Sequence, residues 1–268
     1  MNKVIASILF LVVTTSSVAA FKAEDVEKLS ATRSCGGCDL RGAKLQYQEL
    51  REAQLAAANF RDSFLKHVDF SNANLAGADL RRSDMEKAIL ISANLEQAIL
   101  QDADLEKAMM ANATLSRADL RNADFDSAEI EGGMFQDADI RNANFKRARL
   151  ADANFTGAKM SGVNFKRAVM IGATMTRAEL TNAQFIRVDL SGARLDHADI
   201  RYANFYRANL TNVDFSGSRL ADALFWGANL SGANLKDARG LKQEQIDAAC
   251  GDDKTRLPGK LKVAKCTS

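Results

Sequence analysis

The sequence predicts an all-β solenoid, a coil with four short sides of five residues each. From Leu40 to Leu235 every fifth residue is large and apolar, with no insertion or deletion. These 40 positions hold 21 Leu, 11 Phe, 5 Met and 3 Ile, and Ala stands two residues before the apolar one in 30 of the 40 units. A period of five fits neither a single helix nor a flat strand.

A four-sided coil explains each position of the unit. One large and one small side chain point inward from every side, and Ala fits where four walls converge. The residue before the apolar one is Asp or Asn about half of the time, as in Ala73-Asn74-Leu75. Such short polar side chains suit corners because they bond nearby backbone amides. An inserted residue would turn the inward set outward.

The first twenty residues have the features of a secretory signal peptide. Lys3 precedes an apolar run over residues 4–13, and small residues end the segment at Ala20. The run is too short to cross a bilayer, which takes roughly 20 residues. We therefore expect a signal peptide at 1–20, cleavage near Ala20, a periplasmic or secreted protein, and no membrane span in the mature chain.

Both ends of the solenoid are expected to carry short helical caps. Ala23–Ser30 resembles a helix within an N-terminal cap (21–37), and residues 243–250 resemble a helix within a C-terminal cap (240–268). The repeats occupy 38–239. In an exported chain four cysteines predict two disulfides. They are Cys35, Cys38, Cys250 and Cys266. A zinc site of all four is excluded because the pairs lie at opposite ends. A redox role for the first pair lacks the α/β scaffold that depresses a thiol pKa.

The units, for example Ala78-Asp79-Leu80, resemble the motif A(D/N)LXX of the pentapeptide-repeat family. This resemblance implies a right-handed quadrilateral β-helix with twenty residues per coil and about ten coils. The Cys35-Gly36-Gly37-Cys38 start and the tail from Glu244 to Cys266 resemble those of exported members from Gram-negative bacteria. That likeness implies a Cys250–Cys266 bridge that locks the C-terminal cap.

Residues twenty apart stack in columns, and one column pair is basic. On the side centred at Leu45, the N-terminal rungs also carry carboxylates, whereas the later rungs carry none in these two columns. Tyr206 and Trp226 stand beside the later cations. Like charges about 4.8 Å apart repel, and the fold does not require them. The candidate polyanion stripe is Lys146, Arg147, Lys166, Arg167, Arg187 and Arg207.

Two other sides have different patterns. On the side centred at Leu40, Arg follows Asp by two residues, as in Asp79 and Arg81, which indicates weak surface pairing. On the side centred at Leu50, apolar residues flank the buried centres and suggest a contact surface or a homodimer. Scattered surface apolar residues are the alternative. The candidate interface is Ile89, Ile91, Met109, Val169 and Ile171.

No catalytic constellation, metal site or cofactor site is predicted. His67 and His197 fall on different sides about six coils apart, and a filled rod offers no cleft. With 36 Lys and Arg against 34 Asp and Glu, a formal net charge of +2, no nucleic-acid partner is expected. Some family members resemble DNA and protect gyrase, but an export signal and a basic column argue against gyrase here.

These observations predict an exported, non-enzymatic interaction scaffold, a rod-shaped protein-binding module of the periplasm or cell envelope. Its partner would be another protein or a second copy. The alternative is a binder of a linear anionic polymer, lipopolysaccharide or acidic polysaccharide, through the basic stripe. Regularly spaced cations suit a repetitive ligand, and such binding weakens with salt.

Overall fold

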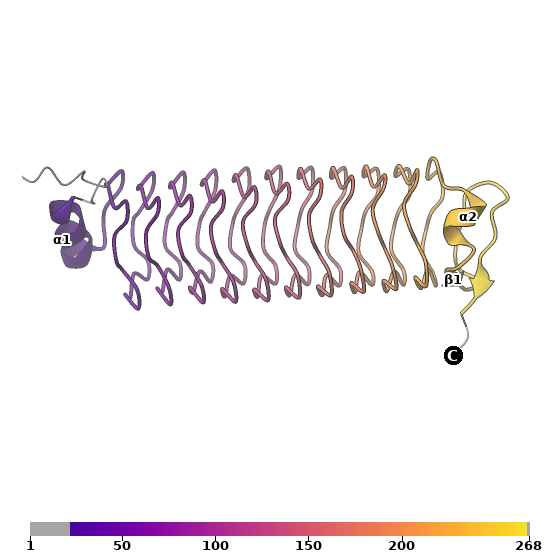
Figure 1. Ribbon diagram of the computed structural model, residues 1–268, viewed down its shortest axis with the longest axis horizontal. Coiled ribbons are helices and arrows are strands. Elements are labelled where there is room, and N and C mark those ends of the chain that lie inside the picture. The colour runs from indigo at the N-terminus through magenta and orange to yellow at the C-terminus, as the bar shows by residue number, and fades with distance from the viewer. Residues whose placement is uncertain (1–21, 267–268) are drawn as a thin grey trace, which may run out of the picture.

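The computed structural model describes residues 22–266 and shows a rod of stacked coils with a cap at each end (Figure 1). Parallel β-bridges join residues that are twenty apart, from Ser34 with Gln54 to Arg219 with Arg239. Each five-residue unit supplies one bridging residue and one two-residue turn. The coil is therefore a four-sided solenoid of isolated bridges rather than of long strands. The coil number, about ten, stays a prediction.

Where Asp or Asn precedes the apolar residue, its side chain completes the hydrogen bonding of the unit, which explains the sequence motif. In the unit 73–77, the amides of Asn74, Leu75 and Gly77 donate to carbonyls of neighbouring coils, and that of Ala73 closes a turn within its own coil. The fifth amide, that of Ala76, donates to the side-chain Oδ1 of Asn74 at 3.2 Å. Buried or half-buried backbone amides need such partners. Asp or Asn before the apolar residue is thus the acceptor for the turn, as the sequence predicts.

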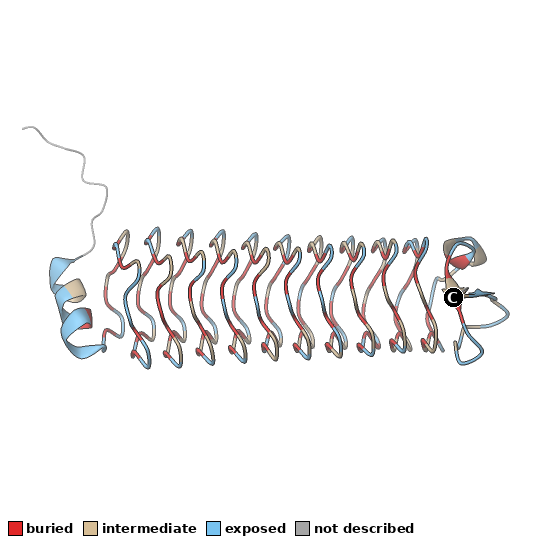
Figure 2. Ribbon diagram, turned by 90° about the horizontal axis from the view of Figure 1, so that it is seen from below, coloured by how far each residue is buried: buried red, intermediate tan, exposed pale blue. Residues whose placement is uncertain are grey.

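The apolar and small residues of the repeat are buried and fill the interior of the rod (Figure 2). All forty large apolar centres are at most 5 % exposed, and the alanines before them are buried as well. Where Ser replaces Ala inside, the hydroxyl is satisfied locally, as Ser83 Oγ donates to the Leu80 carbonyl at 2.7 Å. From Phe125 to Phe225 one column consists of stacked rings with centroids 4.6–5.3 Å apart. The rod is a packed core and not a channel.

The N-terminal cap is the helix α1 (Ala23–Thr32), which covers the first coil. Its Leu29 is buried, and the Asp25 carboxylate accepts the Asp39 amide at 2.8 Å. The helix is two residues longer than the sequence predicts. Beside it, Cys35 and Cys38 form a disulfide. Burial of Leu29 and the hydrogen bond to Asp25 therefore hold the helix against the first coil.

The C-terminal cap differs from the prediction. Helix α2 (Gln243–Ile246) ends four residues before Cys250, which lies instead in strand β1 (Cys250–Gly251). Cys250 continues the ladder, because its amide donates to the Ala228 carbonyl at 3.0 Å and its carbonyl accepts the Leu230 amide at 2.7 Å. β1 pairs in parallel with β2 (Ala264–Lys265). The need to close the last coil thus overrides helix extension.

The Cys250–Cys266 bridge implied by the family resemblance is confirmed. The expected signal peptide, 1–20, lies outside the described residues. Over residues 22–266, none of the helices has the length and apolar character that crossing a bilayer requires.

Candidate functional site

The cations of the candidate stripe project from the turns of the Leu45 side. Arg167, Arg187 and Arg207 occupy the second turn residue and have φ of 60°, 56° and 52°. In the next coil Gly227 takes the same place with φ 67°. A left-handed backbone disfavours residues with a Cβ atom, so Gly or Asn would satisfy the turn better than Arg. The fold therefore gives no reason for arginine at these positions.

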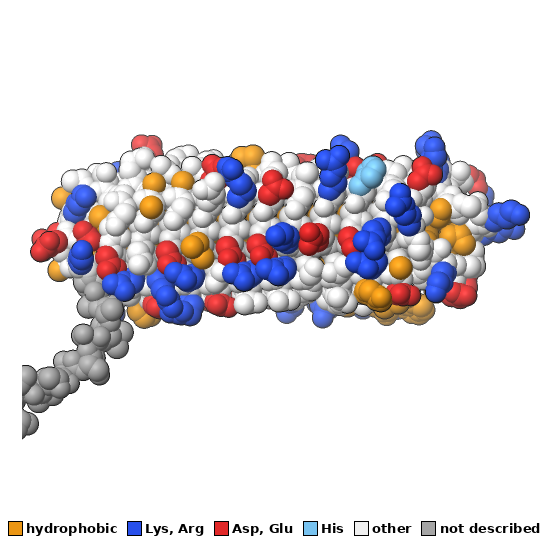
Figure 3. Space-filling model, turned by 90° about the horizontal axis from the view of Figure 1, so that it is seen from above, with side chains coloured by type: hydrophobic (Ala, Val, Ile, Leu, Met, Phe, Trp, Pro, Cys, Tyr) orange, Lys and Arg blue, Asp and Glu red, His pale blue; other side chains and the backbone are white. Residues whose placement is uncertain are grey.

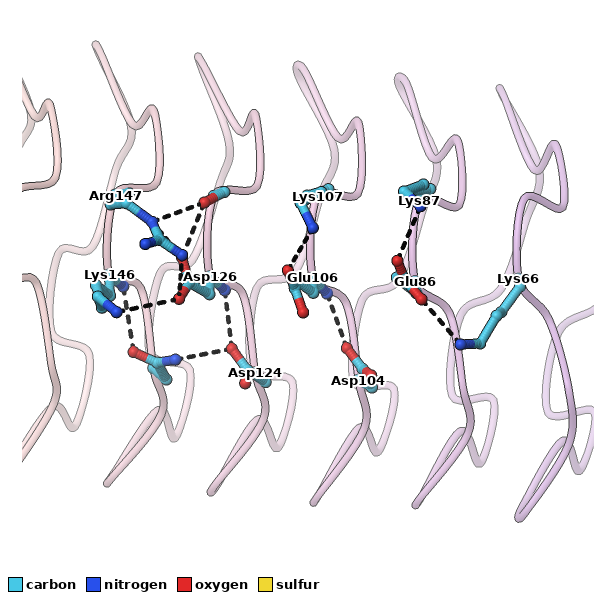
Figure 4. Close-up of polar contacts among 12 residues, drawn as sticks. Lys66, Glu86, Lys87, Asp104, Glu106, Lys107, Asp124, Asp126, Lys146 and Arg147 are labelled. Atoms are coloured by element: carbon cyan, nitrogen blue, oxygen red, sulfur yellow. Dashed lines mark hydrogen bonds and ion pairs between the residues drawn. The ribbon is translucent and has the colours of Figure 1, made fainter.

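The first basic residues of this side are paired with carboxylates of the neighbouring column (Figure 4). Lys66 and Lys87 both contact Glu86, with N–O distances of 2.8 and 3.0 Å. Lys107 contacts Glu106 at 2.6 Å. The hydrogen bonds from Lys66 and then Lys87 lower the pKa of Glu86 to about 2. This part of the side is electrically balanced.

Asp126 also pairs two members of the candidate stripe. Arg147 donates to its carboxylate at 2.8 Å, and Lys146 Nζ lies 3.8 Å away (Figure 4). In the sequence Asp126 is one of the carboxylates of the N-terminal rungs, and the columns do not show that these two cations reach back one coil to it. Four cations of the stripe have no ion pair within residues 22–266. They are Lys166, Arg167, Arg187 and Arg207.

Three of these four cations, Lys166, Arg167 and Arg187, border a shallow hollow with a volume of about 580 Å³. Its lining is Lys146, Lys166, Arg167, Ile186, Arg187 and Tyr206. Half-buried Ile186 gives it an apolar floor. The sequence analysis did not predict this floor. Its only signal is that Ile186 follows Lys146 and Lys166 in the same column. The hollow combines fixed positive charge with apolar contact.

An aromatic pair closes the C-terminal end of the stripe. The rings of Tyr206 and Trp226 are stacked with centroids 5.0 Å apart. The Arg207 guanidinium lies 5.3 Å from the Tyr206 centroid and 5.6 Å from that of Trp226. Trp226 remains 52 % exposed. Arg207 thus has a cation–π contact but no carboxylate among the described residues.

A ladder of carboxylates, which sequence reasoning missed, lies in the N-terminal half of the same side. Asp84, Asp104 and Asp124 bridge in register, one coil apart. Burial, together with Asp84 and Asp124, raises the pKa of Asp104. Asp84 lies 3.4 Å from Lys66, whereas Asp104 and Asp124 have no ion pair within residues 22–266. The signal was present in the sequence, because these three residues are twenty apart, but it was not singled out among the many Asp residues of the motif.

The Leu40 side is a series of local pairs, as expected. Arg81 contacts Asp79, and Arg121 contacts Asp119 at 2.8 Å. The Arg41 hydrogen bond holds the pKa of Asp39 below its ordinary value. Figure 3 shows one face of the rod, on which basic and acidic side chains adjoin in a row. Such exposed pairs contribute little energy each.

The Leu50 side carries the candidate interface in two separate patches. Met109, Val169 and Ile171 are 42 %, 38 % and 45 % exposed, whereas Ile89 and Ile91 are half-buried. Between the patches Arg149 contacts Glu131 at 2.6 Å. The five residues thus share a side but do not form one continuous apolar surface.

The remaining chemically capable groups are engaged in structure. Asp25, Cys35 and Cys38 place ligand atoms within 4.8 Å of one another, but the two sulfurs are joined to each other. The His67 ring stacks on Tyr47 with centroids 4.9 Å apart. His197 Nδ1 lies 3.4 Å from an Asp196 oxygen. The structure brings no two of these groups together around a cleft within residues 22–266.

One known structure shares this architecture over most of its length. HetL, a pentapeptide repeat protein involved in heterocyst differentiation regulation from the cyanobacterium Nostoc sp. strain PCC 7120, is 29 % identical with a TM-score of 0.76, over 80 % of this chain and 96 % of HetL. QnrB1, a plasmid-mediated fluoroquinolone resistance protein, is 19 % identical with a TM-score of 0.31, over 78 % of this chain and 92 % of QnrB1. No curated protein matches the sequence. The prediction that gyrase is not a partner stays a prediction.

Two family profiles match the repeat region. The profile for pentapeptide repeats matches in eight copies, at residues 34–70, 49–86, 148–183, 178–217 and 218–239. The profile for a pentapeptide repeat region matches residues 78–155. Members fold as right-handed quadrilateral β-helices and are generally non-enzymatic structural modules. The matches together span the coils from the first bridge to the last, and the chain belongs to the pentapeptide repeat family.

Proposed function

We propose that this protein is a non-enzymatic interaction scaffold, a rod whose sides bind protein partners in the periplasm or cell envelope. The observation that carries the proposal is the filled interior: all forty central side chains are buried at the axis. The hollows found over residues 22–266 lie open on the surface. A rod of this kind acts through its sides, because ligands and catalytic groups are normally held in concave sites.

The proposed location rests on two features. Met1–Ala20 has the pattern of a signal peptide. The two disulfides of the described residues support an oxidising compartment. Cell fractionation with N-terminal sequencing tests this part. A mature protein that begins at Phe21 and is recovered oxidised from the periplasm or medium supports export, and full-length reduced protein in the cytoplasm contradicts it.

Site-specific photo-crosslinking in living cells tests the scaffold role. A photo-reactive residue at Ile171, exposed on the Leu50 side, is compared with one at Lys159, exposed on the Leu40 side. Discrete protein adducts from at least one side support a scaffold. Absence of adducts from Ile171, Lys159 and a third position, Arg187, would leave the rod without a protein partner and refute the proposal.

A second candidate function is binding of a linear anionic polymer, lipopolysaccharide or acidic polysaccharide. It is favoured by Lys166, Arg167 and Arg187, which border the hollow and have no ion pair within residues 22–266. Polygalacturonate and lipopolysaccharide are titrated across a salt series. The variant Arg167→Gln/Arg187→Gln/Arg207→Gln should lose binding, whereas a control with the same charge change on the Leu40 side should keep it. That control is Arg81→Gln/Arg121→Gln/Arg201→Gln. Equal losses in both variants would refute a defined stripe.

A further inference from the structure

The positive charge of the C-terminal half of the rod lies on one side. Over the five coils of residues 138–237, the Leu45 side carries six Lys and Arg and no Asp or Glu. In the same coils the Leu40 side carries four cations and four carboxylates, and the Leu50 side carries one cation and two carboxylates. The fourth side, centred at Leu55, carries three of each. Because all sides are built from the same unit, the fold does not require this difference.

Most of this charge is not neutralised within the rod. Asp126, one coil earlier, pairs with the first two cations of the stripe. The two carboxylates at the borders of this side, Asp189 and Asp222, form no ion pair with the others within residues 22–266. The exposed cations that remain are Lys166, Arg167, Arg187 and Arg207. The side therefore offers uncompensated positive charge to a partner.

One of its two outward columns changes from basic to apolar toward the C-terminal end. The residue after the buried centre is, in successive coils, Lys146, Lys166, Ile186, Tyr206 and Trp226. Leu224, before the last centre, is 55 % exposed, and Trp226 is 52 % exposed. The adjacent column stays basic as far as Arg207, whose guanidinium lies beside the rings of Tyr206 and Trp226. Exposed apolar side chains therefore adjoin the line of cations.

This combination indicates the chemistry of the partner. A polyanion would neutralise the cations but would leave Leu224 and Trp226 in water. Tyr206 and Trp226 are stacked nearly parallel, so that one face of each ring is covered and cannot hold a sugar ring. An anionic phospholipid bilayer satisfies both requirements, because its headgroups attract Lys and Arg and its interface accommodates Trp and Leu side chains.

The open shape of the site also favours a bilayer. The hollow bordered by Lys166, Arg167 and Arg187 lies open on the surface, so it does not enclose a small molecule. An acidic protein would have to match the fixed spacing of the coils, about 4.8 Å, with carboxylates of its own. Lipid headgroups instead move laterally and can meet each cation where it stands.

We propose that the C-terminal half of the Leu45 side binds the surface of an anionic phospholipid bilayer. Lys166, Arg167, Arg187 and Arg207 contact headgroup phosphates, and Leu224 and Trp226 enter the interface beside them. The N-terminal half of the same side carries four cations against six carboxylates, so only the C-terminal half is attracted. This inference goes beyond the scaffold proposal, because it gives the rod a surface to lie on and leaves its other sides free for proteins.

Vesicle co-sedimentation of the purified, oxidised protein tests the contribution of charge. Vesicles of phosphatidylglycerol and phosphatidylcholine should bind the protein at low salt and release it at high salt, whereas vesicles of phosphatidylcholine alone should not bind it. The stripe variant Arg167→Gln/Arg187→Gln/Arg207→Gln should bind about a hundredfold more weakly. Its Leu40-side control, described above, should bind nearly as well as the native protein. Equal losses in the two variants, or binding that does not depend on salt, would overturn the proposal.

A charge-neutral variant tests the apolar contribution. Leu224→Asn/Trp226→Thr should keep the coil, as circular dichroism can verify, because Asn204 and Thr156 already occupy these positions of the unit elsewhere. The variant should bind anionic vesicles about tenfold more weakly and should leave any binding of polygalacturonate unchanged. If it binds vesicles as well as the native protein does, insertion is refuted and the stripe acts through charge alone.

Trp226, the single tryptophan of the chain, reports insertion directly in the native protein. Its emission should shift to shorter wavelength with anionic vesicles and should be quenched by lipids with brominated acyl chains. Polygalacturonate supplies charge without an apolar interface and should cause no shift. Absence of quenching would overturn the proposal. Absence of vesicle binding together with a protein adduct from Arg187 in cells would assign this side to a protein instead, and would leave the scaffold proposal standing.

Discussion

Replacing Phe165 by Ala should strongly destabilise the rod. Phe165 is fully buried, and its ring stacks between those of Phe145 and Phe185 at centroid distances of 5.2 and 5.3 Å. Truncation of a buried Phe to Ala costs about 3–5 kcal/mol. A loss near 5 kcal/mol is expected here, because two ring contacts are lost at once. The backbone hydrogen bonds to the neighbouring coils also fix the spacing of the coils, so that the cavity cannot collapse.

Equilibrium unfolding in guanidinium chloride, followed by circular dichroism and by Trp226 fluorescence, measures this loss. Phe165→Leu is the matched variant: Leu already fills 21 of the forty central positions, so this change should cost only about 1 kcal/mol. Lys159→Ala, at an exposed position, should be nearly neutral. If Phe165→Ala is no more destabilising than Phe165→Leu, the ring column is not a packing device and the reasoning is wrong.

Three further predictions concern the ends and the charges. Removing the C-terminal disulfide with Cys250→Ala/Cys266→Ala should cost about 3 kcal/mol, since it closes a loop of 16 residues, and should speed hydrogen exchange in β1; an unchanged unfolding midpoint would contradict this. Asp104→Asn should raise stability at neutral pH by a few tenths to about 1 kcal/mol. The reason is that the pKa of Asp104 is raised in the folded protein, so the native protein loses stability as the carboxyl ionises with rising pH. Denaturant midpoints of the variant and the native protein should therefore converge in acid, and a gap that stays constant with pH would refute the raised pKa of Asp104. The pKa of Glu86 is about 2 in the folded protein against an ordinary 4.5, so its ion pairs stabilise the protein above pH 4.5 and this stability is lost as pH falls toward 2. Glu86→Gln should therefore make the free energy of unfolding fall less steeply with pH in acid. An equally steep fall in the variant and the native protein would argue against the Lys66 contact.

Much of the fold follows from the sequence because the repeat has no insertions. A strict period of five determines which residues point inward, and all forty predicted centres are buried. The role of Asp and Asn at corners was also predictable, since Asn74 accepts the amide two residues later. The helix predicted to reach Cys250 ends at Ile246, because Cys250 hydrogen-bonds to the last coil as a strand. Local helix propensity does not include this tertiary contact.

Charge pairing was harder to predict from columns. Column reading places Lys146 and Arg147 in a basic series, but it does not show that both side chains reach back to Asp126. Long side chains span more than one coil, so partners twenty-one residues apart matter as much as those in register. The Asp104 ladder was missed for a different reason: its members are in register, but each looks like an ordinary Asp of the motif.

The backbone of the stripe permits a test that separates function from folding. Arg187 has φ 56°, a conformation that costs a residue with a Cβ atom roughly 1 kcal/mol or more. Arg187→Gly should therefore stabilise the folded protein by about 1 kcal/mol, and it should also relieve repulsion between neighbouring cations. The same change should weaken binding of an anionic polymer to the stripe.

The matched control is a glycine-to-arginine substitution at the same turn position on another side. Gly192 has φ 70° on the Leu50 side, and nothing lies within 4 Å of a Cβ atom built there. Gly192→Arg should thus cost about 1 kcal/mol through its backbone alone and leave stripe binding unchanged. Denaturant unfolding and titration with polygalacturonate, applied to both variants, should give opposite signs for the change in stability and a loss of binding in Arg187→Gly only. If Arg187→Gly were less stable than the native protein, Arg187 would stabilise the coil. The argument that the stripe is a binding surface would then be refuted.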